Sequence, residues 1–104
     1  MARFDLYANP VAGERRHTPY LLDVQNDFID SLATRVVIPL RSAVAFGPRA
    51  RDLNPLLEVR GAELVLDTAA LGAIPVAELR APVANLKPQQ GAVTEALDAL
   101  FGAY

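Results

Sequence analysis

Apolar and polar residues alternate near the start of the chain, and this pattern predicts β-structure. In residues 3–8, Phe4 and Leu6 would face one side of a strand and polar side chains the other, which is the two-residue period of a half-buried strand. Residues 9–18 contain an Asn-Pro pair and a glycine, which break regular structure and indicate an exposed hairpin loop. A second strand is expected over residues 19–24.

A third strand is predicted over residues 34–40, which are rich in β-branched side chains. About ten residues connect it to the second strand and a parallel crossover needs a dozen or more, so the two strands should be antiparallel. Pro39 is unusual there, because proline cannot donate a ladder hydrogen bond and is poorly suited to a central strand. Asp23 falls on the polar side of the second strand, and the connector that follows begins with the polar run 25–27.

Turn signals divide the second half of the chain into short elements. Residues 42–46 indicate a single helical turn, which a Gly-Pro pair ends. A hairpin is expected from residues 56–59 to residues 63–67, because the Arg-Gly pair between them is typical of a short hairpin loop. Residues 74–77 include a proline and indicate a short edge strand. Residues 88–101 indicate a helix, since proline suits a first helical turn.

This last helix is expected to pack one apolar face on the sheet. Its apolar residues recur at the i, i+3, i+4 spacing of an amphipathic helix: Val93, Ala96, Leu97, Leu100 and Phe101. About five antiparallel strands followed by one helix predict a small α+β, barrel-like fold. The chain has no internal repeat, linker or low-complexity segment, so residues 1–104 are expected to form a single domain.

Composition narrows the possible functions. The net charge of −2 and the pI near 5.2 disfavour direct nucleic-acid binding, which usually draws on an excess of basic residues. The run 15–17 with Arg49 and Arg51 would form only local positive spots, and solvated loop charge is the simpler interpretation. The chain has no cysteine, no charged-then-apolar leader and no apolar run near the roughly 18 residues of a membrane span. A soluble, cytoplasmic protein is expected.

No arrangement of residues predicts a catalytic, metal or cofactor site. Asp23, Asp27 and Asp30 resemble a carboxylate cluster, but they lack the glycine-bearing pattern of a calcium loop. Their expected role is to accept backbone N–H bonds in an irregular turn, as Asx-turns do. His17 is the only histidine, and no glycine-framed serine accompanies it, so no acyl-transfer triad can be drawn.

Two stretches carry a resemblance to a known family. Residues 22–30 read LDVQNDFID and residues 35–40 read RVVIPL, and FDLY at residues 4–7 adds a third match. Together with a terminal helix that ends in Phe101, they resemble the CcdB toxins of bacterial addiction modules. The resemblance implies an SH3-like barrel shared with the MazF and Kid toxins, with extra strands and a C-terminal helix.

The resemblance also implies partners and a mechanism. CcdB-like toxins are homodimers that present their C-terminal helices side by side, and the helix tip inserts into the dimerisation region of the DNA gyrase A subunit. They trap the cleaved DNA complex by binding a conformational intermediate, so the toxin needs no catalytic residue and is not an enzyme. A CcdA-like antitoxin neutralises them, and no direct nucleic-acid or membrane binding is expected.

Gyrase-binding positions carry over residue by residue. Phe4 and Tyr7 match the family's first strand, Asn26 stands where serine is usual, and Phe28 replaces an aliphatic contact residue. Asp98 stands where the gyrase-contacting helix usually has asparagine. The chain ends in Phe101, Gly102, Ala103 and Tyr104, where the family ends in Phe-Trp-Gly-Ile.

Two other functions remain open at this point. The chain could be a CcdB-fold protein that binds an antitoxin but has lost or changed its target. It could also be a ribonuclease of the MazF kind, using Thr34 and Arg35, or Arg16 and His17, although the acidic pI weighs against it. Fold resemblance alone does not separate these functions.

Overall fold

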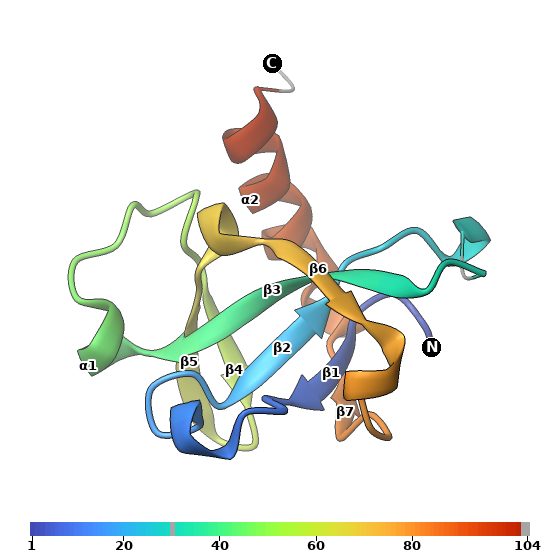
Figure 1. The fold of residues 1–104 in the computed structure, drawn as a ribbon. Coiled ribbons are helices and arrows are strands. Elements are labelled where there is room, and N and C mark those ends of the chain that lie inside the picture. The colour runs from blue at the N-terminus through green and yellow to red at the C-terminus, as the bar shows by residue number, and fades with distance from the viewer. Residues whose placement is uncertain (30, 103–104) are drawn as a thin grey trace.

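A strongly curled antiparallel sheet forms the body of the protein, and one helix packs against it and projects past it (Figure 1). The computed structural model describes residues 1–29 and 31–102. The sheet has seven strands: β1 (Asp5–Ala8), β2 (Tyr20–Asp23), β3 (Thr34–Ser42), β4 (Leu56–Val59), β5 (Ala62–Leu66), β6 (Gly72–Pro75) and β7 (Ala84–Asn85). The two α-helices are α1 (Ala43–Phe46) and α2 (Gln90–Phe101).

Strand β3 is the centre of the sheet. It pairs with β2 along one side, and its other side pairs first with β6, over residues 34–37, and then with β5, over residues 40–42. The full strand order is β4-β5-β3-β2-β1-β7, with β6 branching from β3. All these pairings are antiparallel, which confirms the predicted α+β, barrel-like fold.

Pro39 occupies the point where β3 changes partner. Its carbonyl accepts a hydrogen bond from the N–H of Asp67, on the side of the strand that faces β5 and β6. The proline nitrogen faces the same side, because the two backbone groups of a strand residue point in one direction. The missing N–H therefore falls between the segments paired with β6 and β5, and a central strand tolerates the proline there.

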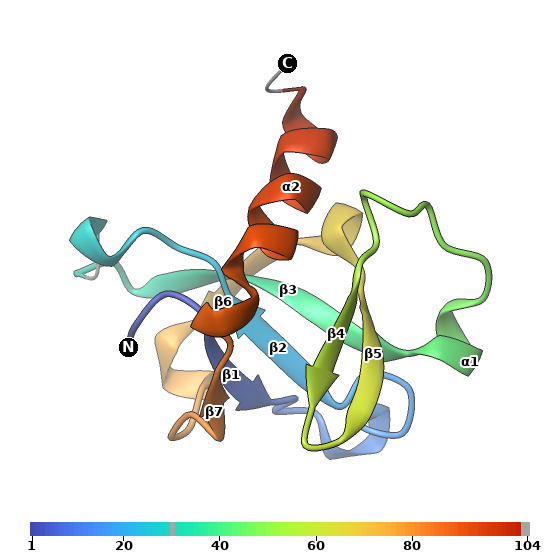
Figure 2. The same cartoon turned by 180° about the vertical axis from the view of Figure 1, so that it is seen from behind.

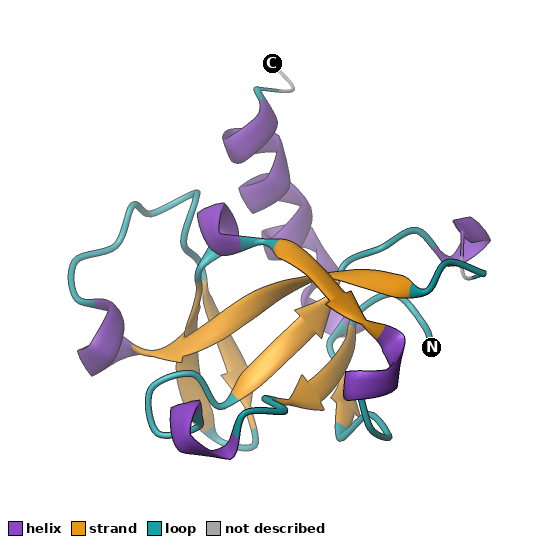
Figure 3. Ribbon diagram, viewed as in Figure 1, coloured by secondary structure: helices purple, strands orange, loops and turns teal. Residues whose placement is uncertain are grey.

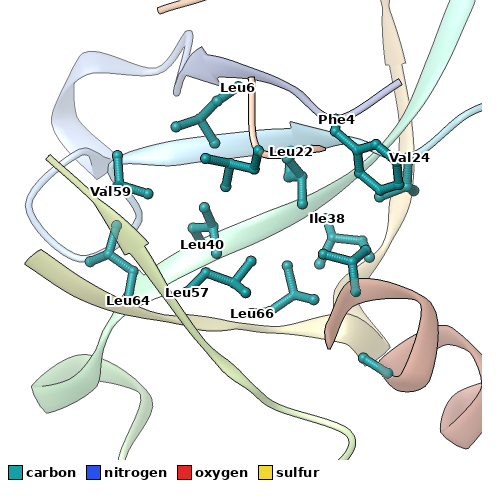
Figure 4. Packing of buried hydrophobic residues seen from close by; sticks show 13 residues of the cluster. Phe4, Leu6, Leu22, Val24, Ile38, Leu40, Leu57, Val59, Leu64 and Leu66 are labelled. Atoms are coloured by element: carbon teal, nitrogen blue, oxygen red, sulfur yellow. The ribbon is translucent and has the colours of Figure 1, made fainter. Parts of the chain in front are cut away.

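The main core fills the inside of the curled sheet (Figure 4). Leucine, valine and isoleucine side chains from five strands meet there, together with Phe4. The helix α2 closes this core with Val93 and Ala96, both fully buried. Each fully buried large aliphatic side chain stabilises the fold by about 1.5–3 kcal/mol, so this cluster is the main source of stability.

The outer face of the sheet carries a second, smaller core. Tyr7, Leu21 and Val37 come from β1, β2 and β3 and pack with Leu79, which follows the short 3₁₀ helix η4 (Val76–Glu78). Strand β6, which pairs with β3 (Figure 1), contributes Ile74 to this core. The strands around the centre are therefore buried on both faces, and their outer side chains are not simply solvated.

Most predicted elements are confirmed with small shifts at their ends. The predicted β1–β2 and β4–β5 hairpins and the antiparallel pairing of β2 with β3 are all present. Ser42 caps the short helix α1 by accepting a hydrogen bond from the N–H of Ala45. Figure 3 shows this helix and the single helical turns at several other connections. The sequence pattern missed the two-residue strand β7, which is too short to carry a period. Within the described residues, none of the helices is both long and apolar enough to cross a membrane.

Candidate partner-binding surface

The C-terminal half of α2 extends beyond the sheet, as the two opposite views show (Figures 1 and 2). The helix follows the 3₁₀ turn η5 (Lys87–Gln89), in which Pro88 lacks an N–H that a first turn would not use. It ends at Gly102, whose φ of 72° is left-handed and whose N–H donates to the carbonyl of Asp98 at 2.8 Å. Glycine adopts this conformation without a steric penalty, so it is well suited to end the helix.

The projecting end of α2 presents an apolar and acidic surface. Phe101 leaves 69% of its area exposed, and Leu97 and Leu100 on the same stripe are only partly buried. Asp98 is also partly exposed, and no basic residue lies in the last turn to balance it. An exposed aromatic side chain beside partly covered leucines is typical of a surface that binds another protein.

A second exposed aromatic residue lies on the connector between β2 and β3. Phe28, in the 3₁₀ turn η2 (Asp27–Ile29), leaves 93% of its area exposed. Its N–H donates to Asn26 Oδ1 at 2.9 Å, and the side chain of Gln25 donates to the carbonyl of Ile29 at 2.6 Å. These bonds hold Phe28 away from both cores. In Figures 1 and 2 the connector and the tip of α2 are separate projections.

Backbone hydrogen bonds explain the acidic residues of the connector. Asp23 Oδ1 accepts from the N–H of Gln25 at 3.0 Å, and Asp27 Oδ1 accepts from the N–H of Arg3 at 2.6 Å. Both carboxylates are backbone acceptors as predicted, but only Asp23 does so within its own turn, since the donor to Asp27 is the distant Arg3. Asp30 lies outside the described residues. Over residues 1–29 and 31–102, no cluster of three potential metal ligands is present.

Asp23 also forms a buried ion pair, which corrects its assignment to the polar side of β2. Arg35 Nε donates to Asp23 Oδ2 at 2.7 Å, and Arg35 Nη2 donates to Asp23 Oδ1 at 2.9 Å. Both side chains are fully buried on the outer face of the sheet. The hydrogen bonds to Asp23 raise the pKa of Arg35 above its already high value, so this side chain stays charged.

The ion pair fixes the start of the connector. Gln25 follows Asp23, and its side-chain oxygen accepts from the N–H of Val36 at 3.0 Å on the neighbouring strand. The connector therefore leaves the sheet from a rigid, hydrogen-bonded base. Sequence reasoning missed this role of Gln25, because the alternation pattern had placed its neighbour Asp23 on the polar side of the strand and gave no sign of a buried pair with Arg35.

The residues expected to bind gyrase fall into three groups. Phe4 and Tyr7 are buried, one in each core, and we leave them out of the surface proposed below. A second group is at least partly exposed at the surface: Asn26, Phe28, Asp98, Phe101 and Gly102. Ala103 and Tyr104 lie outside the described residues.

The residues considered for a ribonuclease are not gathered in one place. Arg35 is sealed in its pair with Asp23, so its guanidinium does not reach the surface. Arg16 and His17 are exposed on the loop after β1, and the carbonyl of His17 accepts from the N–H of Ser42 at 2.8 Å. This contact places the pair near α1, at the end of β3 opposite Thr34.

The fold and this surface define a class of small α+β half-barrels that present the end of a C-terminal helix. The family model described as CcdB protein matches residues 3–102. The chain belongs to the CcdB family, and it is a toxin of a toxin–antitoxin system.

Proposed function

We propose that this toxin binds the A subunit of DNA gyrase and traps the cleaved DNA complex. Phe101, at the projecting end of α2, is the observation that carries the proposal, because its ring is exposed where the family inserts its helix tip. A buried aromatic anchor contributes about 2 kcal/mol or more at an interface. The toxin acts by binding alone and has no catalytic residues.

The contact surface consists of Asn26, Phe28, Asp98, Phe101 and Gly102, with Ala103 and Tyr104 beyond the described residues. These residues come from the connector and from the last turn of α2. Their mixture of exposed aromatic and acidic groups suits a partner surface that has an apolar pocket with cationic groups beside it. Tyr104 is proposed to supply an aromatic ring in place of the tryptophan that Gly102 replaces.

The active form is proposed to be a homodimer that presents two α2 helices side by side. Leu97 and Leu100 support this arrangement, because they remain partly exposed on the stripe that also carries Phe101. A two-fold contact would cover Leu97 and Leu100 in both protomers and leave Phe101, at the end of the stripe, exposed for gyrase. A CcdA-like antitoxin that orders on binding would neutralise the dimer in the cytoplasm, in a plasmid or chromosomal addiction module.

A changed target is the second candidate, and Gly102 favours it. Glycine at this position ends the helix and supplies no ring, so the usual tryptophan contact is lost. Such a protein would keep the fold, the dimer and the antitoxin but would bind a molecule other than gyrase.

Calorimetric titration of the gyrase A dimerisation region into the toxin tests the proposed function. The full chain should bind, the variant Phe101→Ser should lose at least about tenfold in affinity, and a chain that ends at Ala103 should lose a similar amount. Binding to antitoxin should be the same for all three. If none of the three binds gyrase while all bind antitoxin, the second candidate is correct.

A further inference from the structure

Side chains bridge the two ends of the sheet. Strands β4 and β7 stand at opposite ends of the strand order, and the curl brings the segments around them together. The amide of Gln89 donates from Nε2 to the carbonyl of Glu58 at 2.8 Å, while the N–H of Glu58 donates to Gln89 Oε1 at 2.9 Å. A second bond, from Arg60 Nη2 to the carbonyl of Val83 at 3.1 Å, crosses the same gap.

Gln89 occupies a position that a neighbouring strand would fill. In the β4–β5 hairpin, Val59 lies opposite Ala62 beside a two-residue turn, so hydrogen bonds to β5 come from Val59 and Leu57. The N–H and carbonyl of Glu58 consequently point to the free edge of β4. The Gln89 side-chain amide forms hydrogen bonds with both groups, as a residue of a neighbouring antiparallel strand would. This pair of bonds is called the Gln89–Glu58 bridge below.

The position of Gln89 in the chain connects this bridge to the helix. Gln89 is the residue immediately before α2, where a short polar side chain would ordinarily cap the helix. Its side chain makes no bond to its own helix and turns to β4 instead. Further along α2, Val93 and Ala96 are fully buried in the main core, and the C-terminal part of the helix extends beyond the sheet. The base of α2 is thus held at two places, one polar and one apolar.

We propose that Gln89 is a positioning residue for α2. The Gln89–Glu58 bridge fixes the base of the helix to the edge of β4, and so sets the direction in which the tip at Phe101 points. This inference rests on the proposed function in one respect only: if the tip of α2 binds gyrase, the direction of the helix affects the affinity for gyrase. The positioning itself is independent of what the tip binds.

Nuclear magnetic resonance of the full-length chain tests the positioning directly. In the wild type, residual dipolar couplings of α2 and of the sheet should fit one alignment tensor. The variant Gln89→Ala should lower protection of the Glu58 amide from exchange by about tenfold and should scale down the couplings of α2 alone. The variant Gln90→Ala is the matched control, because it changes an exposed neighbour, and it should leave both readouts unchanged.

The variant Gln89→Glu provides a rescue. At neutral pH its carboxylate still accepts from the N–H of Glu58 but has no proton to donate to the carbonyl of Glu58 and repels that oxygen, so the couplings of α2 should be scaled down as in Gln89→Ala. Below about pH 4 the protonated acid regains one donor and one acceptor, so the couplings of α2 should again fit the tensor of the sheet. Wild-type protection in Gln89→Ala, or α2 couplings that still fit the tensor of the sheet, would overturn the proposal. Neither result depends on gyrase, so the two proposals fail separately.

Discussion

Arg35 and Asp23 form a two-pronged ion pair from which solvent is excluded, with donor–acceptor distances of 2.7 and 2.9 Å. Removal of one partner from such a pair leaves a buried charge without compensation. The substitution Asp23→Asn should therefore lower the free energy of unfolding by about 3–5 kcal/mol, measured by urea denaturation.

The pair between Arg41 and Asp67 is the matched control. Its two atoms are 2.5 Å apart, but both side chains are partly exposed, so solvent screens the charges. Asp67→Asn should lower the free energy of unfolding by no more than about 1 kcal/mol. Equal losses for the two substitutions would show that burial of the Arg35–Asp23 pair does not decide its contribution.

Tyr7 should make the protein sensitive to alkali. Burial, followed by the nearby carboxylates of Asp5 and Asp23, raises its pKa from 10.0 to about 12. Above pH 10 the unfolded state loses this proton while the folded state keeps it, so stability falls as pH rises from about 10 to 12. The slope due to this group should approach about 1.4 kcal/mol per pH unit.

The variant Tyr7→Phe should lack this part of the pH dependence. Its buried ring still fills the outer core, so it should fold, and its free energy of unfolding should decline less steeply than that of the wild type above pH 10. Chemical denaturation at several pH values between 8 and 12 measures the difference. Parallel pH profiles would mean that Tyr7 ionises as readily in the folded protein as in the unfolded chain.

Two glycines at opposite ends of α2 should respond to alanine with opposite signs. A Cβ added at either position meets no atom within 4 Å, so space does not distinguish them. Gly91 has an ordinary helical backbone, and Gly91→Ala should stabilise the protein by about 0.5–1 kcal/mol. Gly102 has a φ of 72°, so Gly102→Ala should destabilise the helix end by about 1–2 kcal/mol. Thermal unfolding of both variants checks the two signs.

Phe28 should contribute to target binding and not to stability. Its ring is 93% exposed, so Phe28→Ser should change the free energy of unfolding by less than about 0.5 kcal/mol. Affinity for gyrase should fall by about tenfold. Val44, which is 96% exposed on α1 at the opposite side of the molecule, is the control, and Val44→Ser should leave both quantities unchanged. Equal affinities for the two variants would remove the connector from the contact surface.

Local patterns were sufficient to predict most of the strands and the terminal helix. Alternation at Phe4 and Leu6 and the turn signal at Arg60-Gly61 arise within a few residues, and they located the first strand and the β4–β5 hairpin correctly. The expected half-burial of the first strand was wrong, because Asp5 and Tyr7 on its other side are buried too. Pro39 was recognised as unusual, but its position between the two partners of β3 depends on a strand pairing that no local pattern contains. The same holds for Asp23, which alternation placed in solvent because the outer core is assembled from distant segments.

The candidate surface was predicted only in part, for a similar physical reason. Exposure of Phe28 and Phe101 agrees with a contact role that the family resemblance implied, whereas burial of Phe4 and Tyr7 follows from two cores that the sequence pattern did not distinguish. The sequence pattern did not predict any role for Gln89. Its function depends on the curl that brings the start of α2 to the edge of β4, which is a property of the whole sheet.

A DNA cleavage assay with gyrase from the same organism tests the central claim most directly. Purified toxin, gyrase, ATP and supercoiled plasmid are incubated, protein is then denatured and digested, and linear DNA is measured. The wild type and Val44→Ser should produce linear DNA to the same extent, Phe101→Ser should produce much less, and added antitoxin should abolish the product. If the wild type produces no linear DNA and leaves supercoiling activity intact, while an established gyrase poison works in parallel, the toxin does not act on gyrase.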